Sequence, residues 1–449
     1  MIDKWVKIEG TNFICENKPF VIKGFGIGTF LNIEHFMLKI PGIEQNIRKS
    51  FEEVFGKEVA KDFWRNFEIS FFDESDANFM RQIGVNTIRL PFNYHHLYDD
   101  SEDIFIESGF NSIDRVVEIC ERNDIYVILD LHAAPGGQNP DWHSDNPTGE
   151  SLFWHYGIFQ KKIIELWELI AKRYSDRKAI LGYDILNEPV IEDRNISGNI
   201  VNSFYNKVIS AIRKYDKNHI IFLEGDFYAS DTSKFEVLED SNVAYSIHFY
   251  PFFYVEKNLK KYKKFSKSER INFLRESLKG RLEDIKNRLG RPVWCGETGV
   301  PYRIKYLDLL ENLLDETLEV FHIENVSWSI WTYKDANSMG ILFPKKDSLW
   351  TNLTTKLTKN WNFLSEFAHS DENALNYIKK FLPEITPDVE LIRKVKFRLL
   401  SIRDLILIEK LKKELKQIST DKITQLPLSF KIENCEVWYD LLKIIKKWL

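Results

Sequence analysis

The strongest constraint on the fold of this chain is a repeated alternation of two kinds of segment. Short apolar runs rich in β-branched residues alternate with longer amphipathic segments, a pattern typical of buried parallel strands and their connecting helices. Eight such runs occur, at residues 20–24, 87–90, 125–131, 180–186, 219–223, 243–249, 292–296 and 326–331. Eight strand–helix units predict an α/β protein with a (β/α)8 TIM barrel.

An open, doubly wound sheet is the alternative architecture for such an alternation. Its nucleotide-binding form needs a GxGxxG turn after the first strand, but Gly24-Phe25-Gly26-Ile27-Gly28 lacks the third glycine at the required position. The barrel is therefore favoured, with helices expected at 159–174, 271–289 and 306–321. The long first connection, residues 29–76, is predicted to carry extra helices.

The pattern changes towards the C-terminus, where only helical periodicity is seen. Helices are expected at 371–382, 388–418 and 439–449, the second capped by Asp388 after Pro387. We therefore expect two parts: a barrel domain over residues 1–367 and a helical extension, 368–449, packed on it.

Two glutamates stand where apolar runs stop. Glu188 follows the fourth run in Leu-Asn-Glu-Pro, and Glu297 follows the seventh in Cys-Gly-Glu-Thr. In a TIM barrel the C-terminal ends of the strands carry the active site. A pair of carboxyl groups at that end is the minimum set for cutting a glycosidic bond, one as proton donor and one as nucleophile or base.

Together with the other residues at the run ends, this pair resembles glycoside hydrolase family 5, the cellulase-type family of retaining (β/α)8 glycosidases. The resemblance covers roughly residues 1–365 and implies a substrate of β-linked glycosides or oligosaccharides. All the positions that the family uses hold the expected residue types. They are Arg89, His132, Asn187, Glu188, His248, Tyr250, Glu297 and Trp331.

Physical roles can be assigned to these residues. Glu188 must carry a proton to the leaving oxygen, so its pKa is expected to be the higher of the pair. Glu297 must stay ionised to attack the anomeric carbon, and Arg89 or Tyr250 beside it would favour that state.

The supporting residues have roles of their own. Asn187 is expected to hold a sugar hydroxyl, and His132 and His248 to bind hydroxyls or tune the acid. Trp331 is expected to form a flat floor under the reacting sugar.

Two loops beyond the strands are further candidates for sugar contact. The Gly/Pro-rich segment 134–146 contains Gln138, Asn139 and Trp142, and loops of this kind shape subsites. After the eighth run, Lys334 or Asp335 is expected to reach a neighbouring subsite.

Composition excludes several classes of partner. The net charge is −5 with acids and bases interspersed, so nucleic acid is not expected. Neither a signal-peptide core nor a run long enough to span a membrane is seen. Four scattered cysteines suggest reduced thiols, hence a cytoplasmic protein. No cofactor is expected. No metal is expected either, because HxH and HExxH spacings are absent. The oligomeric state is left open.

The sequence thus predicts a retaining β-glycosidase that hydrolyses β-linked glucosides, mannosides or short β-oligosaccharides and acts from the chain end. An endo-β-1,4-glucanase or β-mannanase is the alternative within the same chemistry. A non-catalytic carbohydrate-binding barrel is the alternative from another class. The retaining mechanism requires the carboxyl groups of Glu188 and Glu297 to lie about 5 to 5.5 Å apart.

Overall fold

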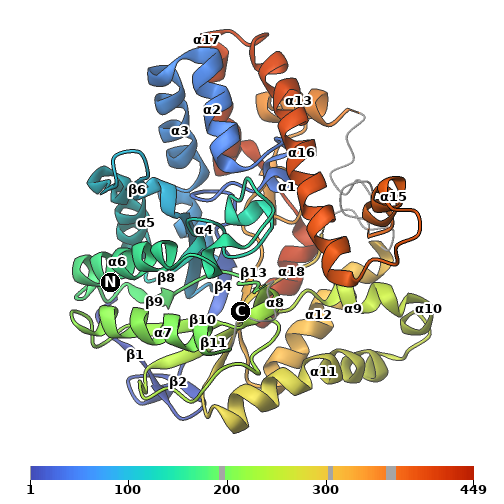
Figure 1. The fold of residues 1–449 in the computed structure, drawn as a ribbon. Helices are drawn as coiled ribbons and strands as arrows, with labels where there is room; N and C mark the ends of the chain where they lie inside the picture. Colours follow the sequence, from blue (N-terminus) through green and yellow to red (C-terminus); the bar gives the residue numbers. More distant parts are fainter. Residues whose placement is uncertain (1, 192–197, 302–306, 360–370) are drawn as a thin grey trace.

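The computed structural model describes residues 2–191, 198–301, 307–359 and 371–449. Its centre is a closed barrel of eight parallel strands in the order β4, β5, β8, β9, β10, β11, β12, β13 (Figure 1). The strands are β4 (Lys23–Gly26), β5 (Thr87–Asn93), β8 (Tyr126–Ala133), β9 (Ile180–Asp184), β10 (Ile220–Glu224), β11 (Val243–His248), β12 (Val293–Thr298) and β13 (Ser327–Ile330). Each overlaps a predicted run, so the TIM-barrel prediction is confirmed.

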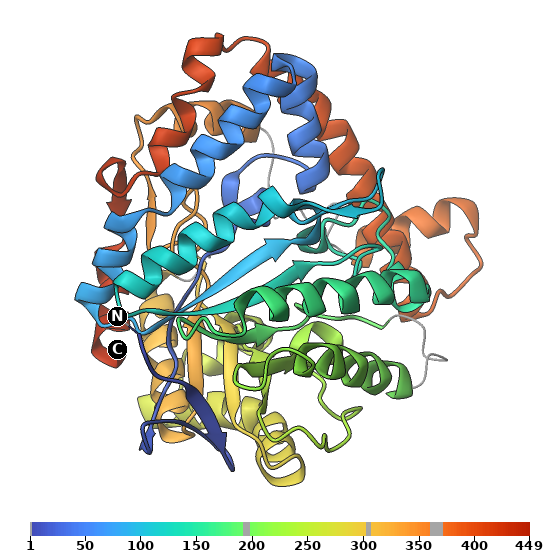
Figure 2. The ribbon, with the colours of Figure 1, turned by 90° about the vertical axis from the view of Figure 1, so that its left-hand side faces the viewer.

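A small antiparallel sheet closes the N-terminal end of the barrel (Figure 2). It consists of β1 (Val6–Glu9), β2 (Asn12–Cys15) and β3 (Lys18–Pro19). Its Val6 and Phe13 pack against inward side chains at the strand starts, among them Phe222 and Trp294. The first barrel strand starts later than predicted because Phe20 still hydrogen-bonds to Phe13 of this sheet.

Helices follow the strands and form the outer layer (Figures 1 and 2). They are α5 (Phe110–Arg122), α6 (Gly157–Tyr174), α7 (Gly198–Arg213), α8 (Asp226–Ala229), α9 (Pro251–Lys257), α10 (Leu259–Tyr262), α11 (Lys267–Glu283) and α12 (Leu307–Ile323). Three of them, α6, α11 and α12, match the predicted helices. The predicted start of α12 at Tyr306 lies outside the described residues.

The long connection between β4 and β5 carries extra helices, as predicted. They are α1 (His35–Leu38), α2 (Glu44–Phe55), α3 (Lys57–Phe71) and α4 (Glu74–Ile83). Helix α4 begins at a capping box. The Asp73 side chain accepts the backbone N–H of Ser75, and the Asp76 side chain accepts the backbone N–H of Asp73. A short hairpin of β6 (Tyr98–Asp99) and β7 (Ile104–Phe105) follows β5.

Helix α13 (Leu349–Thr358) follows the last barrel strand. The C-terminal extension beyond it contains α15 (Asp371–Phe381), α16 (Val389–Leu415), α17 (Thr420–Ile423) and α18 (Tyr439–Trp448). The three tail helices expected from the sequence are present, and the Asp388 side chain caps α16 by accepting the N–H of Leu391.

Several segments of this extension contact the barrel and the helices around it. Strand β15 (Cys435–Val437) pairs with β14 (Leu342–Pro344), and Phe430 packs on Phe67 of α3. At the far end, Lys447 of α18 forms an ion pair with Asp315 of α12, 2.7 Å apart. The predicted domain boundary at 367/368 lies outside the described residues, so that division stays a prediction.

Helix α16 runs across the end of the barrel opposite the N-terminal sheet (Figure 2). Its Ile408 contacts Gly42 in the β4–β5 connection, and Phe397 and Leu400 pack against Trp142 in the loop after β8. The extension therefore lies on the face where the strands end.

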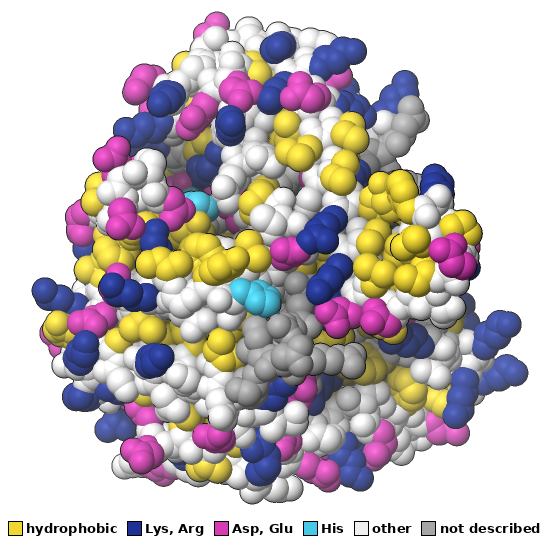
Figure 3. Space-filling view, viewed as in Figure 1, with side chains coloured by type: hydrophobic (Ala, Val, Ile, Leu, Met, Phe, Trp, Pro, Cys, Tyr) yellow, Lys and Arg dark blue, Asp and Glu magenta, His cyan; other side chains and the backbone are white. Residues whose placement is uncertain are grey.

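Exposed apolar side chains gather over α15 and α16 on the face seen in Figure 3. They include Phe381, Val389, Ile402, Leu405 and Ile406. Within the described ranges, no helix combines the length and apolarity that crossing a bilayer requires.

Candidate active site

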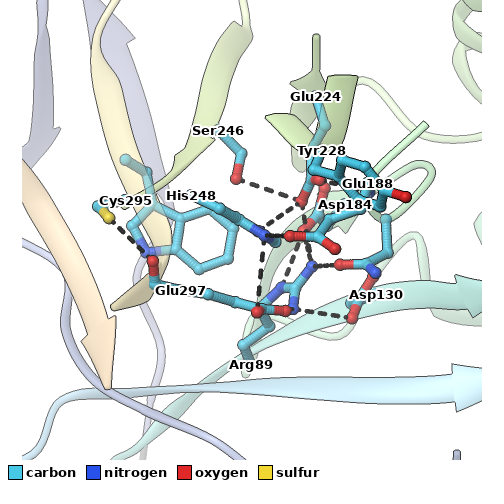
Figure 4. A network of polar contacts seen from close by, with 12 residues as sticks. Arg89, Asp130, Asp184, Glu188, Glu224, Tyr228, Ser246, His248, Cys295 and Glu297 are labelled. Carbon is cyan, nitrogen blue, oxygen red and sulfur yellow. Dashed lines mark hydrogen bonds and ion pairs between the residues drawn. The ribbon is translucent and has the colours of Figure 1, made fainter. Parts of the chain in front are cut away.

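The residues predicted at the strand ends converge at the C-terminal end of the barrel. Glu297 is the second-last residue of β12, His248 is the last residue of β11, and Glu188 follows β9. Arg89 lies within β5, and all of these side chains point into one polar network (Figure 4).

Glu297 is held from two sides. Arg89 Nη1 donates to Oε1 at 2.6 Å, and the Tyr250 hydroxyl donates to Oε2 at 2.6 Å. Both predicted partners are thus in place. Because each donor favours the charged carboxylate, the pair opposes the effect of burial on this side chain.

Arg89 is the centre of the network and is fully buried. Besides Glu297 it contacts three more carboxylates, those of Asp130 at 3.2 Å, Asp184 at 2.9 Å and Glu224 at 3.1 Å. Burial opposes its charge, but these carboxylates outweigh that effect and raise its pKa well above the usual value. Arg89 therefore acts as a permanent cation that positions Glu297, and burial keeps it from touching a sugar.

Sequence reasoning missed Asp130, Asp184 and Glu224. Glu224 ends β10, so the strand-end argument applied to Glu297 would have found it. Asp184 and Asp130 lie within apolar runs, and a charged residue in a strand buried on both faces is itself a signal of a specific partner.

Glu188 has a constrained backbone, with φ 47°. A non-glycine residue in this left-handed region costs energy and persists only where the surroundings hold it. Here the Glu188 N–H donates to Glu224 Oε2 at 2.6 Å, and Asn139 Nδ2 donates to the Glu188 carbonyl at 2.9 Å. These bonds fix where the carboxyl group points.

The Glu188 carboxyl group lies between two imidazoles. His248 Nδ1 is 2.7 Å from Oε1, and His143 Nε2 is 3.2 Å from Oε2. His248 was predicted to tune the acid. His143 was not predicted, because nothing in the sequence fixes the path of the loop that carries it.

The expected order of the two pKa values is wrong for the site as it stands. Burial alone would raise the pKa of Glu188, but the contacts with His143 and His248 outweigh it and hold that pKa below its ordinary value. Burial raises the pKa of Glu297, although His248 and Arg89 oppose the shift. The prediction named His132 and His248 as the histidines that tune the acid, whereas the second imidazole on Glu188 is that of His143.

The two glutamates face each other at short range. One carboxylate oxygen of Glu188, one of Glu297 and a ring nitrogen of His248 all lie within 4.8 Å of one another. Retaining glycosidases hold their two carboxyl groups about 5–5.5 Å apart, and inverting ones about 6.5–9.5 Å. The close approach seen here fits the retaining spacing better than the inverting one.

A flat aromatic surface borders this pair. The Trp331 and His132 rings stack with their centroids 5.4 Å apart and planes within 2°. His132 Nδ1 bonds Asp130 at 2.7 Å, and its Nε2 lies 3.6 Å from the buried carboxyl group of Glu34. The contact with Asp130 overcomes burial and raises the pKa of His132 to about 10.

Asn187 points into the same network. Its Oδ1 accepts from Arg89 Nη2 at 2.8 Å, and its Nδ2 lies 3.4 Å from His132 Nε2. The structure therefore brings every predicted strand-end residue together.

Gln138 and Asn139, predicted to contact sugar, have other partners in the structure. Both are completely buried. The Gln138 amide bonds the backbone of Ala134, His132 and Asn187, and Asn139 bonds the Asp141 N–H and the Glu188 carbonyl. A long loop at a barrel mouth has backbone groups of its own to satisfy, and these amides do so. They support the site without touching substrate.

Trp142 lies at the edge of the site, with its ring 4.7 Å from that of His35 and packed on Phe397 and Leu400 of α16. Its predicted sugar contact stays a prediction.

Lys334 and Asp335 do not reach a subsite. Lys334 is fully buried and forms an ion pair with Asp76 at 2.7 Å, besides bonding the carbonyl of Phe430 in the C-terminal extension. Asp335 accepts the N–H groups of Ser338 and Met339. Lys334 therefore joins the barrel to the extension, and Asp335 stabilises its own turn.

Glu188, His248 and Glu297 are close enough together to be compared with a metal site. The donor set does not suit one. His248 Nδ1 bonds Glu188 and its Nε2 lies 3.0 Å from Glu224, so both nitrogens face carboxylates, and a protonated ring has no lone pair to offer a metal. The Arg89 guanidinium on Glu297 would also repel a dication.

Comparisons with known proteins agree with this geometry. Residues 48–337 match the sequence profile of cellulase, glycosyl hydrolase family 5. The chain is 34% identical to a β-xylosidase of Phanerodontia chrysosporium, over 96% of this chain and 95% of that protein. Endoglucanase C of Acetivibrio thermocellus is 26% identical, over 59% of this chain and 84% of that protein.

Solved structures show the same fold. Thermotoga maritima Cel5A in complex with mannotriose superposes with a TM-score of 0.52 at 18% identity, covering 72% of this chain and 91% of that chain. The resemblance seen in the sequence is thereby confirmed: the chain belongs to glycosyl hydrolase family 5 and is a glycoside hydrolase.

Proposed function

We propose that this enzyme is a retaining β-glycosidase in which Glu297 is the nucleophile and Glu188 the acid/base. The observation that carries the proposal is the close approach of their carboxylates, with oxygens within 4.8 Å. That spacing leaves no room for a water molecule between the nucleophile and the anomeric carbon. The asymmetric partners support these roles: Glu297 contacts a guanidinium, and Glu188 contacts two imidazoles.

In the first step, a Glu297 oxygen attacks the anomeric carbon while the bond to the leaving oxygen breaks. Glu188 gives that oxygen a proton, and a covalent glycosyl ester on Glu297 results. Arg89 and Tyr250 keep Glu297 ionised beforehand, and they accompany the carboxylate that leaves again in the second step.

In the second step, water attacks the same carbon from the face that the leaving group vacated. Glu188, now ionised, takes a proton from this water as the ester bond to Glu297 breaks. Two inversions return the β configuration. Trp331 and His132 supply the aromatic floor, and Asn187 stands beside the acid where a sugar hydroxyl would bind.

For the substrate, we propose short β-linked glycosides cut from the chain end. Helix α16 lies against Gly42 and Trp142, loops at the mouth of the barrel, and this favours a pocket over an open groove. The buried Glu34 carboxyl group beside His132 is suited to accept hydrogen bonds from the hydroxyls of a terminal sugar.

The full-length similarity to a β-xylosidase supports action on the chain end. It also adds β-xylosides to the β-glucosides and β-mannosides expected from the sequence. We further propose a cytoplasmic location, supported by four unpaired cysteines, three of them buried.

An endo-acting glucanase is the second candidate, supported by the similarity to endoglucanase C. A non-catalytic barrel is disfavoured by the intact polar network around both glutamates. The deciding experiment is a panel of aryl β-xylosides, β-glucosides and β-mannosides together with cello- and xylo-oligosaccharides. Release of single sugars from the chain end supports the proposal. Internal cleavage of polymer supports the endo alternative, and inactivity on the whole panel would refute both.

A further inference from the structure

His143 presents an unusual arrangement around a single nitrogen. The residue is buried in the loop after β8. Its Nε2 lies 3.2 Å from Oε2 of Glu188 and 2.8 Å from Nδ2 of Asn139. These two neighbours require opposite protonation states of that nitrogen.

The orientation of the Asn139 amide is fixed by two other bonds. Its Oδ1 accepts the N–H of Asp141 at 3.0 Å, and its Nδ2 donates to the Glu188 carbonyl at 2.9 Å. The remaining N–H of this amide therefore points at His143 and needs a lone pair on Nε2. An ionised Glu188, by contrast, needs an N–H on the same nitrogen. His143 thus has a partner both with and without its proton.

His248, the other imidazole on Glu188, has no such choice. Its Nδ1 lies 2.7 Å from Glu188 and its Nε2 3.0 Å from Glu224, with Glu297 a further 3.6 Å from Nδ1. Loss of either proton would turn a lone pair towards a carboxylate. His248 therefore keeps the proton on Nδ1 that faces Glu188.

We propose, on the basis of the retaining mechanism above, that His143 and Glu188 share the catalytic proton, with His143 as its store. Before reaction the proton resides on His143 Nε2 and Glu188 is ionised. The proton passes to Glu188 Oε2 and from there to the leaving oxygen as the glycosidic bond breaks, and the neutral His143 then accepts the Asn139 N–H. When water attacks the glycosyl ester, the ionised Glu188 takes one proton of that water and passes it back to His143 Nε2, so the pair ends as it began.

The charges around His143 support this role. Glu188 faces it from the end of β9, Asp141 from its own loop and Glu34 from the β4–α1 connection. Burial opposes the charge on His143, but the contact with Glu188 outweighs it and raises the pKa of the imidazole. Two rings also approach, Tyr228 of α8 at 6.4 Å and His132 at 5.9 Å between centroids. On α16, Lys396 acts on Asp141 at longer range.

The test is His143→Gln, which keeps an N–H donor for Glu188 but holds no exchangeable proton. Rates are measured against pH for a series of aryl glycosides, from the phenyl to the 2,4-dinitrophenyl glycoside. We expect the alkaline limb of kcat/KM to move down by about one pH unit or more, because the last proton must then reside on Glu188. The phenyl glycoside should lose about tenfold or more in rate, and the dinitrophenyl glycoside, which needs no acid, less than about threefold.

His155→Gln is the matched control, because it removes an exposed histidine from the same loop. An unchanged alkaline limb in His143→Gln would overturn the inference, as would an equal loss for every leaving group. His143→Asn repeats the test should the glutamine variant fold poorly. The two proposals fail separately: a wild type without glycosidase activity refutes the proposed function, and an active wild type with an unaltered variant refutes only the shared proton.

Discussion

The hydrogen bond from Tyr250 to Glu297 gives a quantitative prediction for Tyr250→Phe. The hydroxyl donates to Glu297 Oε2 at 2.6 Å inside the barrel, where burial limits the competition of water for this hydrogen bond. A hydrogen bond to a charged group contributes about 1.5–3 kcal/mol. Since one pKa unit corresponds to about 1.36 kcal/mol, its loss should raise the pKa of Glu297 by about one to two units.

The sign of the pH effect follows from the role proposed for Glu297. The hydroxyl favours the ionised carboxylate, so its removal makes Glu297 protonate at higher pH. Only the ionised form attacks, and the acidic limb of kcat/KM should therefore move up by about one to two pH units. Below that limb the variant should lose about 10- to 100-fold, and well above it the loss should be only a few-fold.

The assay is a pH–rate profile with one aryl β-glycoside, run in parallel for the wild type and two variants. Tyr254→Phe is the control, because its hydroxyl accepts from Arg281 and does not contact Glu297. An acidic limb that stays in place in Tyr250→Phe, or that moves to lower pH, would refute the electrostatic account of Glu297.

Three further changes test other parts of the structure. Glu188→Gln should lose about two to four orders of magnitude on an unactivated disaccharide, measured as released sugar, while its circular dichroism stays native; turnover near the wild-type level would remove Glu188 from the acid role. Arg89→Met leaves buried carboxylates without their cation and should cost about 3–5 kcal/mol in urea unfolding, together with most of the activity. Lys334→Met should also cost about 3–5 kcal/mol, with kcat unchanged within about twofold, because Lys334 lies away from the chemistry. The Lys334→Met cost should be smaller at about pH 5 than at about pH 7, since burial already raises the pKa of its partner Asp76 and protonation relieves the unpaired charge; equal costs at both pH values would contradict this.

The barrel could be predicted from the sequence because the alternation of apolar runs and helix-length segments is repeated eight times. Apolar runs of four to eight residues are too short for the helices of a core and are typical of buried strands. Eight such runs separated by helix-length segments predict a closed (β/α)8 barrel. The boundary errors were local. Phe20 belongs to the N-terminal sheet through its bond to Phe13, and no residue type marks where one sheet ends and the barrel begins.

The site could be predicted as far as strand ends define it. Glu188, Glu297, Arg89 and His248 meet because parallel strands deliver their ends to one place. Glu224 was not predicted, although it ends β10 and the same argument reaches it.

Loop residues were the weakest part of the prediction. Gln138 and Asn139 were expected to bind sugar, but their amides satisfy the backbone of their own loop. His143 and Glu34 approach the site only because two long connections fold over it, and no local pattern encodes that path. The pKa order of the glutamates failed for the same reason, because it depends on an imidazole from such a loop.

The central claim is that Glu297 is the nucleophile and Glu188 the acid/base, and azide rescue tests it most directly. In Glu297→Ala, azide fills the space of the lost carboxylate and should convert an activated aryl β-glycoside into the α-glycosyl azide. In Glu188→Ala, azide should attack the covalent intermediate from the opposite face and give the β-glycosyl azide. NMR of the products distinguishes the anomers. The α-azide from Glu297→Ala and the β-azide from Glu188→Ala are the predicted results, swapped anomers would reverse the two roles, and no azide product from either variant would contradict the double-displacement account.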